Sequence, residues 1–257
     1  MYKTLTVDVF KKRTGLPADY QIEGLLAVGT WDLYSAVHAP VFQQLLEELG
    51  YPQTLKKIES VQLGHAYEFV VEGKKFWFVP VMGTAVMSQY AHMASLLGSK
   101  KNILVGTVGG LKEGILTAEF ILPTASKGND NAYMYDRTAE NQMFYPNEKL
   151  RNSLKERLGG LTVHEGHTTT CEVMFAETSE DVKQWSDEGY LGVEMEAAMM
   201  FALSKHFNIP SAAVLFVTDN LVEEITFFDP RHNESKAIRF EARKKQFLVA
   251  LQELIAE

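Results

Sequence analysis

Short apolar runs that alternate with amphipathic segments constrain the fold of this chain more than any other feature. Four runs are apolar on both faces, as buried strands are: residues 25–28, 76–81, 103–105 and 212–217. Helical periodicity is clearest in three other segments: residues 41–49, 85–97 and 233–255. Strands that alternate with helices predict an α/β layered fold, in which helices flank a central, mostly parallel, mixed sheet.

The remaining segments predict smaller features. Residues 58–63 and 67–71 have the pattern of a hairpin appended to the sheet, and Ser179 begins a short helix with acidic residues in its first turn. Residues 127–145 are polar and contain Gly128 and Asn129, which predicts a long surface loop. No composition shift or repeat marks a boundary, so we expect a single domain over residues 1–257.

The bulk composition limits the classes of partner. The formal net charge of −8 at pH 7 argues against nucleic acid or an anionic membrane as the main partner. No apolar run reaches the ~20 residues of a membrane span. Cys171 is the only cysteine, so no intramolecular disulfide can form and we expect a cytoplasmic protein. His164 and His167 lack the accompanying ligand pattern of a metal site, so no metal is expected.

Glycine followed by threonine recurs at the ends of three predicted strands. The pairs are Gly29 with Thr30, Gly83 with Thr84, and Gly106 with Thr107. Each pair alone is equally typical of a strand-to-helix turn. In open α/β sheets, however, ligands bind at the carboxyl ends of strands, where glycine permits close approach and threonine offers a hydroxyl. Together the three pairs predict one shared ligand crevice.

Three acidic residues stand in an apolar setting towards the end of the chain. Glu194 and Glu196 open an apolar helical run, and Asp219 follows the strand predicted up to residue 217. Burying a carboxylate is costly unless it is paired or used. These carboxylates are therefore candidate site residues, and Asp219 adds a fourth strand end to the predicted crevice.

Two pairs of motifs carry a family resemblance. The stronger pair is V-G-T-V-G-G-L at 105–111 and G-V-E-M-E-A-A at 192–198 with V-T-D-N at 217–220. The weaker pair is V-M-G-T-A-V-M-S-Q-Y at 81–90 and T-C-E-V-M-F-A-E at 170–177. On these segments the chain resembles the nucleoside phosphorylase-I family of purine nucleoside phosphorylases, uridine phosphorylases and related nucleosidases. The similarity extends from Gly24 to the C-terminal helix and implies cleavage of an N-glycosidic bond.

The resemblance implies roles for the acidic residues. Glu196 would accept hydrogen bonds from the 2′- and 3′-hydroxyls of the ribose, and Met195 would pack against the sugar. Glu194 would either bind the sugar as well or serve as a structural cap or ion-pair partner. Asp219 matches the catalytic aspartate of purine-specific members, in which an acid at the purine N7 neutralises the departing base. A plain helix N-cap is the alternative role for Asp219.

The remaining positions of the family's site also have counterparts here. For the base, the resemblance implies Met174, Phe175, Thr218 and Gly109, although core packing explains Met174 and Phe175 equally well. For phosphate it implies Gly29, Gly106 and Thr107, with Thr30 as a further hydroxyl. No metal or organic cofactor is implied, and inorganic phosphate would be a co-substrate. Because the family forms dimers, trimers or hexamers, the resemblance also implies a homo-oligomer.

Two positions depart from the phosphorylase pattern. Leu33 and Leu104 stand where the family has phosphate-binding arginines, and leucine cannot replace a charged fork. Arg231 or a neighbouring subunit is a candidate source of the missing charge. The motif at 105–111 favours phosphorolysis of purine nucleosides to free base and sugar 1-phosphate. Hydrolysis, with Asp32 or Glu23 orienting water, and non-catalytic nucleoside binding are the alternatives.

Overall fold

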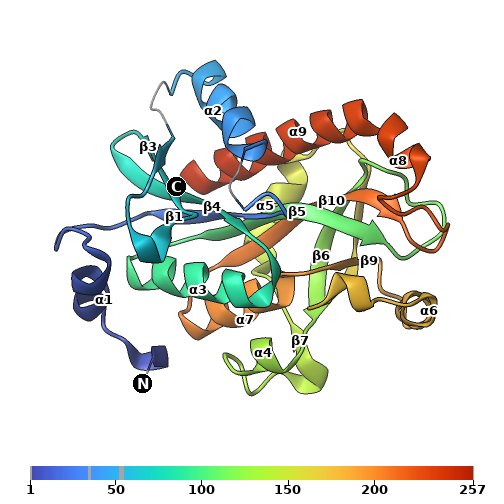
Figure 1. Cartoon of the computed structure of the whole chain (residues 1–257), viewed down its shortest axis with the longest axis horizontal. Helices are drawn as coiled ribbons and strands as arrows, with labels where there is room; N and C mark the ends of the chain where they lie inside the picture. Colours follow the sequence, from blue (N-terminus) through green and yellow to red (C-terminus); the bar gives the residue numbers. More distant parts are fainter. Residues whose placement is uncertain (1, 34–35, 52–54, 257) are drawn as a thin grey trace.

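The computed structural model describes residues 2–33, 36–51 and 55–256. Over these residues ten strands form one mixed sheet, and helices lie on both of its faces (Figure 1). The predicted α/β fold with a central sheet flanked by helices is therefore confirmed. Parallel pairing joins the central strands, which are β4 (Lys74–Val81), β1 (Gly24–Gly29), β5 (Asn102–Gly110) and β10 (Ser211–Asn220).

The strands beyond β5 close into a ring. β10 pairs with both β5 and β6 (Phe120–Lys127), β6 pairs with β8 (Val163–Thr170), and β8 pairs with β9 (Gly192–Glu194). β9 returns to β5 through antiparallel pairing at Gly109 and Gly110. The ring thus gathers the carboxyl ends of β5, β9 and β10, three segments that are distant in the sequence.

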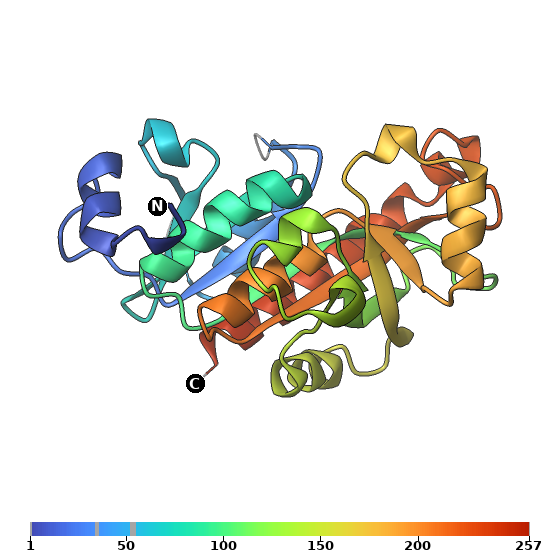
Figure 2. The same ribbon diagram turned by 90° about the horizontal axis from the view of Figure 1, so that it is seen from below.

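Two helical layers bury the two faces of the sheet. α3 (Gly83–Leu96) and α7 (Ala197–His206) lie on one face, and α2 (His38–Glu48), α5 (Glu148–Arg157) and α9 (Lys236–Ile255) lie on the other (Figures 1 and 2). Alternate residues of β1 accordingly enter different cores, with Ala27 on the α3 side and Val28 on the α9 side. This two-sided burial explains why the central strands are continuously apolar.

The C-terminal helix is fixed to the sheet by polar as well as apolar contacts. Its predicted apolar face is buried at Phe247, Leu251 and Leu254. Gln246 is also buried, and its Nε2 donates to the carbonyl oxygens of Gly106 at 2.7 Å and Val214 at 2.5 Å. The predicted helix over 233–255 is in fact two helices, since α8 (Pro230–Glu234) ends just before α9 begins.

One predicted feature of the periphery is wrong, and another is correct only in part. Residues 58–63 form no hairpin strand, because η2 (Val61–Leu63) is a tight turn; β3 (Tyr67–Val71) pairs instead with β4 and with β2 (Lys56–Lys57). The predicted loop over 127–145 contains α4 (Asp130–Tyr133) and β7 (Met143–Phe144). The Asn129 side chain caps α4, and burial of Phe144 holds the segment against the core.

Several elements had no counterpart in the sequence prediction. They are α1 (Val7–Thr14), α5, β6 and β8. The predicted helix start at Ser179 is confirmed by α6 (Ser179–Asp187), where Thr178 and Asp181 form a capping box. In the part of the chain that is described, no helix has both the length and the apolar character needed to cross a membrane.

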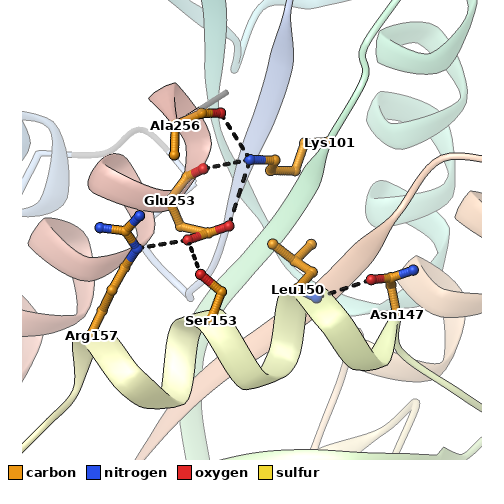
Figure 3. A network of polar contacts seen from close by, with 7 residues as sticks. All are labelled: Lys101, Asn147, Leu150, Ser153, Arg157, Glu253 and Ala256. Atoms are coloured by element: carbon orange, nitrogen blue, oxygen red, sulfur yellow. Dashed lines mark hydrogen bonds and ion pairs between the residues drawn. The ribbon is translucent and has the colours of Figure 1, made fainter.

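A polar network anchors the end of α9 (Figure 3). Glu253 Oε2 accepts hydrogen bonds from Arg157 Nε and Ser153 Oγ on α5, both at 2.6 Å. Lys101, at the start of β5, lies 3.6 Å from Glu253 Oε1, and its Nζ donates to the Glu253 carbonyl at 2.7 Å. The network therefore connects a strand with two helices through one carboxylate.

We expect Glu253→Gln to lower the free energy of unfolding by about 1–3 kcal/mol, because the two cations lose a largely buried counter-charge. Glu165→Gln is a matched control, since Glu165 also contacts two cations, Arg151 and Lys155. The Glu165 side chain is 27% exposed against 8% for Glu253, so its loss should cost less than about 1 kcal/mol. Urea unfolding measures both, and equal losses would contradict the assignment.

Candidate active site

A cavity of about 1080 Å³ opens at the carboxyl ends of β1, β5 and β10, where the crevice was predicted. Its lining brings together residues from the two motifs at 105–111 and 192–198 and from the V-T-D-N segment. Ten of the predicted site residues line it: Gly29, Thr107, Gly109, Met174, Phe175, Glu194, Met195, Glu196, Thr218 and Asp219. Gly106 is the predicted residue that does not, because it packs against Gly29 and bonds to α9.

Glu196 is a buried residue whose side chain lines the cavity. Its Oε1 accepts a hydrogen bond from the Gly83 backbone N–H at 2.6 Å. Gly83 has φ of +73°, in the left-handed region that favours glycine. A Cβ on Gly29 would stand 2.8 Å from Glu196 Oε2, so any other residue there would displace the carboxylate. Burial, and then the charge of Glu194, raise the pKa of Glu196 to about 8.

Glu194 has a structural role, although it also borders the cavity. Its Oε2 accepts from the backbone N–H groups of Glu196 at 2.7 Å and Ala197 at 2.6 Å, which caps the start of α7. Its Oε1 accepts from the hydroxyls of Ser126 at 3.0 Å and Thr170 at 2.5 Å. Both oxygens are engaged within the protein, so the geometry supports the capping alternative rather than sugar binding.

Asp219 lies within β10 at the wall of the cavity and is 9% exposed. A register shift between Val217 and Asp219 sets Asp219 opposite Gly109. Thr218 Oγ1 donates to Asp219 Oδ1 at 2.6 Å. Burial raises the pKa of Asp219, and the Thr218 hydrogen bond opposes that rise. Because β10 continues to Asn220, the alternative role of Asp219 as a helix N-cap does not apply.

Two basic residues beside Asp219 were not predicted. His232 on α8 and Arg239 on α9 line the cavity, and the positive charge of each lowers the pKa of Asp219. Arg239 Nη2 donates to the His232 carbonyl at 2.8 Å. The available signal was a basic run over residues 231–245 in an acidic protein, immediately after the strand that carries Asp219. Helical periodicity alone did not say which of these side chains turn towards the site.

Aromatic side chains surround the mouth of the cavity. Phe175 is 73% exposed, so core packing does not explain it, and its ring lies 5.4 Å from that of Trp31. Trp31 also contacts Phe227, with ring centroids 5.6 Å apart, and Phe228 lies 4.0 Å from Phe227. These four aromatic residues, which we call the aromatic rim, all line the cavity. Only Phe175 was predicted, because the other three lie outside the motifs.

A second acidic residue, Glu177, lies at the same end of the cavity. Burial raises the pKa of Glu177, and the negative charge of Asp219 raises it further. The charge of Asp219 therefore favours the protonated form of Glu177. Glu177 belongs to the T-C-E-V-M-F-A-E segment, in which the sequence analysis predicted site roles only for Met174 and Phe175.

The glycine–threonine pairs have different environments. The hydroxyls of Thr30 and Thr107 belong to cavity-lining residues, and Thr30 Oγ1 lies 2.8 Å from His38 Nε2. Thr84, by contrast, is fully buried beside α4 and donates to Glu172 at 2.5 Å. Two of the three threonines, Thr30 and Thr107, therefore line the predicted crevice. The third pair contributes the Gly83 N–H, which holds the Glu196 carboxylate.

The sequence offered Arg231 as a cation for phosphate and Asp32 or Glu23 as a carboxylate that orients water, but none of the three lines the cavity. Leu104 is fully buried in the core, and Arg231 is ion-paired with Asp229 at 2.8 Å and does not line the cavity. Asp32 accepts from the Val37 N–H at 2.8 Å, and Glu23 pairs with Lys100 at 2.7 Å. The charge of Arg231 is thus already neutralised by Asp229, and the two carboxylates do not border the cavity.

Known proteins are similar to this chain in sequence and in fold. A purine nucleoside phosphorylase DeoD-type from Streptococcus pneumoniae serotype 19F (strain G54) is 28% identical over 205 residues, which are 76% of this chain and 78% of that protein. A purine nucleoside phosphorylase DeoD-type from Clostridium beijerinckii is 28% identical over 159 residues, 58% of this chain and 65% of that protein.

A solved structure of uridine phosphorylase from Vibrio fischeri ES114 has the same fold. It superposes with a TM-score of 0.70 at 15% identity, covering 91% of this chain and 92% of that one. The family model of the phosphorylase superfamily matches residues 40–254. The chain therefore belongs to the phosphorylase superfamily.

Proposed function

We propose that this protein cleaves the N-glycosidic bond of purine nucleosides by phosphorolysis. A phosphate oxygen attacks C1′ of the sugar and forms the new C–O bond while the C1′–N9 bond breaks. The electron pair of that bond passes to the purine, and Asp219 donates a proton to N7. The products are a free base and a sugar 1-phosphate, and Asp219 regains a proton from solvent. The reaction uses inorganic phosphate and no metal or organic cofactor.

One observation carries the proposal: Glu196 and Asp219, from different elements, line one cavity. Glu196 would hold the sugar hydroxyls, and Met195 would contact the sugar. Asp219 is partly shielded from water, and its raised pKa favours the acid form that proton donation requires. Orientation of the reactants and stabilisation of an oxocarbenium-like transition state would account for most of the rate.

A purine is favoured over a pyrimidine because Asp219 requires a basic ring nitrogen to protonate, and N7 is present only in purines. The aromatic rim offers faces on which a bicyclic base can stack. The relatives from Streptococcus and Clostridium are named as purine nucleoside phosphorylases, which supports the same substrate class. Parallel assays with purine and pyrimidine nucleosides test this choice, and preferential cleavage of uridine would contradict it.

Hydrolysis is the second candidate, because Leu33 and Leu104 replace the expected arginines. Its weakness is that neither Asp32 nor Glu23 lines the cavity. The test is release of base from inosine and adenosine with and without phosphate, together with assay of sugar 1-phosphate. Phosphate-dependent release supports phosphorolysis, equal rates in both conditions establish hydrolysis, and tight binding without turnover establishes a non-catalytic binder.

The affinity for the nucleoside is expected to rise with pH and to level off above about pH 8. In the empty site Glu196 has a pKa of about 8, whereas two sugar hydroxyls bind best to its ionised form. Below pH 8 binding therefore requires loss of a proton. Calorimetric titration of inosine into Asp219→Asn protein, in which turnover is slow, measures the effect. Glu196→Gln in the same background should bind weakly at every pH, and a flat profile for intact Glu196 contradicts its role.

The partners proposed for this protein are a nucleoside, phosphate and further copies of the same chain. A homo-oligomer is proposed from the resemblance to the family, in which a neighbouring subunit often completes each site. Light scattering of the purified protein measures the number of subunits. A monomer that retains full activity would contradict this part of the proposal.

A further inference from the structure

Arg243 on α9 is a partly buried cation without a carboxylate partner among the described residues. Its guanidinium carbon lies 4.8 Å from the ring centroid of Phe216 and 5.8 Å from that of Phe247. Its side chain donates to Gln246 Oε1 at 3.1 Å. Burial lowers the pKa of Arg243 to about 9, because no nearby anion offsets the loss of solvation. A cation packed against apolar rings is costly unless it is paired or serves a ligand.

The strand register relates Arg243 to the cavity. Phe216 on β10 is paired with Thr107 on β5, so the two side chains point to the same face of the sheet. Arg243 contacts Phe216 on that face. Thr107 lines the cavity, whereas Arg243 is not among the lining residues, so its charge would act on a ligand from beside the cavity wall. The Thr107 hydroxyl has no hydrogen-bond partner among the residues described, which leaves it available to a ligand.

Thr30 and His38 extend this group from the neighbouring strand β1. Thr30 Oγ1 lies 2.8 Å from His38 Nε2, while His38 Nδ1 is buried without a partner among the described residues. Burial, and then the charge of Arg243, lower the pKa of His38 to about 4, so its ring is neutral at pH 7. The two hydroxyls line the cavity, and the imidazole and the guanidinium, which do not, belong to the groups that commonly support phosphate binding.

We propose that Arg243 supplies, from within the same chain, the positive charge that holds the phosphate nucleophile at the hydroxyls of Thr30 and Thr107. The proposal rests on phosphorolysis as the function. Thr30 directly follows Gly29, whose backbone abuts the Glu196 carboxylate. A phosphate at Thr30 is therefore adjacent to a sugar held by Glu196, which is the arrangement that attack on C1′ requires.

Arg239 does not compete for this assignment. Its guanidinium is directed at His232, and its charge acts on Asp219, at the base end of the cavity. Leu104, where the resemblance places an arginine, is fully buried in the core on the opposite face of β5 from Thr107. The charge at the phosphate position thus has its source in a helix rather than in the strand.

The test varies phosphate and nucleoside separately in steady-state assays of the full chain. Arg243→Met keeps an unbranched stem against Phe216 and Phe247 but removes the charge. It should raise the KM for phosphate by about 10- to 100-fold, with the KM for inosine changed less than about twofold. Arg243→Lys retains the charge without the planar fork, so its KM for phosphate should lie between those of the unaltered protein and Arg243→Met. It also keeps the test possible if the methionine variant does not fold. Arg231→Met is the control and should match the unaltered protein.

Thermal unfolding with inorganic phosphate alone gives a readout independent of turnover. Phosphate should raise the melting temperature of the unaltered protein, and this shift should be lost in Arg243→Met. A folded Arg243→Met or Arg243→Lys protein with an unchanged phosphate KM and an unchanged thermal shift overturns the inference while phosphorolysis stands. If base release needs no phosphate, phosphorolysis fails, and the thermal shift still decides whether Arg243 binds the anion.

Discussion

Asp219→Asn should lower kcat for inosine phosphorolysis by about 10²- to 10⁴-fold, the contribution typical of general acid catalysis. Asparagine preserves the size of the side chain and can still accept the Thr218 hydrogen bond. It cannot deliver a proton to the purine, so the departing base must leave as an anion. The loss should therefore appear in kcat, whereas binding of the nucleoside through Glu196 is largely retained.

The pH profile and the choice of substrate make this test specific. Burial raises the pKa of Asp219, so kcat should fall as pH rises through that pKa and the acid loses its proton. This limb should be absent in Asp219→Asn. A 7-deazapurine nucleoside, which lacks N7, should be a very poor substrate for the unaltered protein. Rapid cleavage of that analogue, or an Asp219→Asn protein with normal turnover, would show that protonation at N7 is not the source of catalysis.

A surface substitution controls for the change of charge. Asp130→Asn alters an exposed acid on α4 that does not line the cavity. Its kcat and pH profile should match those of the unaltered protein. Any common decrease in both variants would point to a general effect of net charge rather than to proton donation.

The residues around Asp219 show which parts of a site local sequence can predict. Asp219, Glu196 and Thr107 lie in contiguous motifs at strand ends, where the position in the chain nearly determines the position in space. His232 and Arg239 come from helices that are packed across the sheet after β10. Their approach to Asp219 depends on how α8 and α9 dock, which helical periodicity does not specify.

The same distinction applies to the fold. The central strands were predictable because burial on both faces makes them continuously apolar. β8 was missed because it reads V-H-E-G-H-T-T-T, a polar sequence. Its three threonines are buried because β8 closes the ring of strands, and the hydroxyl of Thr170 is satisfied by Glu194. A strand stabilised by such a distant partner has no local apolar signal.

Glu194→Ala is expected to have the largest effect on stability. The carboxylate satisfies the Ser126 and Thr170 hydroxyls and two backbone N–H groups at the start of α7. Loss of a helix cap costs about 0.5–2 kcal/mol, and each buried donor left unsatisfied costs about 1–3 kcal/mol. Because the hydroxyls of Ser126 and Thr170 lie 3.0 Å apart and already bond to each other, part of the loss is recovered. We therefore expect the free energy of unfolding to fall by about 3–5 kcal/mol.

Urea unfolding of Glu194→Ala beside Glu188→Ala separates this role from sugar binding. Glu188 is an exposed residue at the end of α6, where it accepts from Gln184, and its loss should cost less than about 0.5 kcal/mol. If Glu194→Ala unfolds like the control yet raises the KM for the nucleoside, Glu194 binds the sugar directly. A large loss of stability instead means that Glu194 acts by holding the turn between β9 and α7. That turn fixes the backbone N–H of Glu196, so sugar binding and the integrity of the helix start depend on the same buried carboxylate.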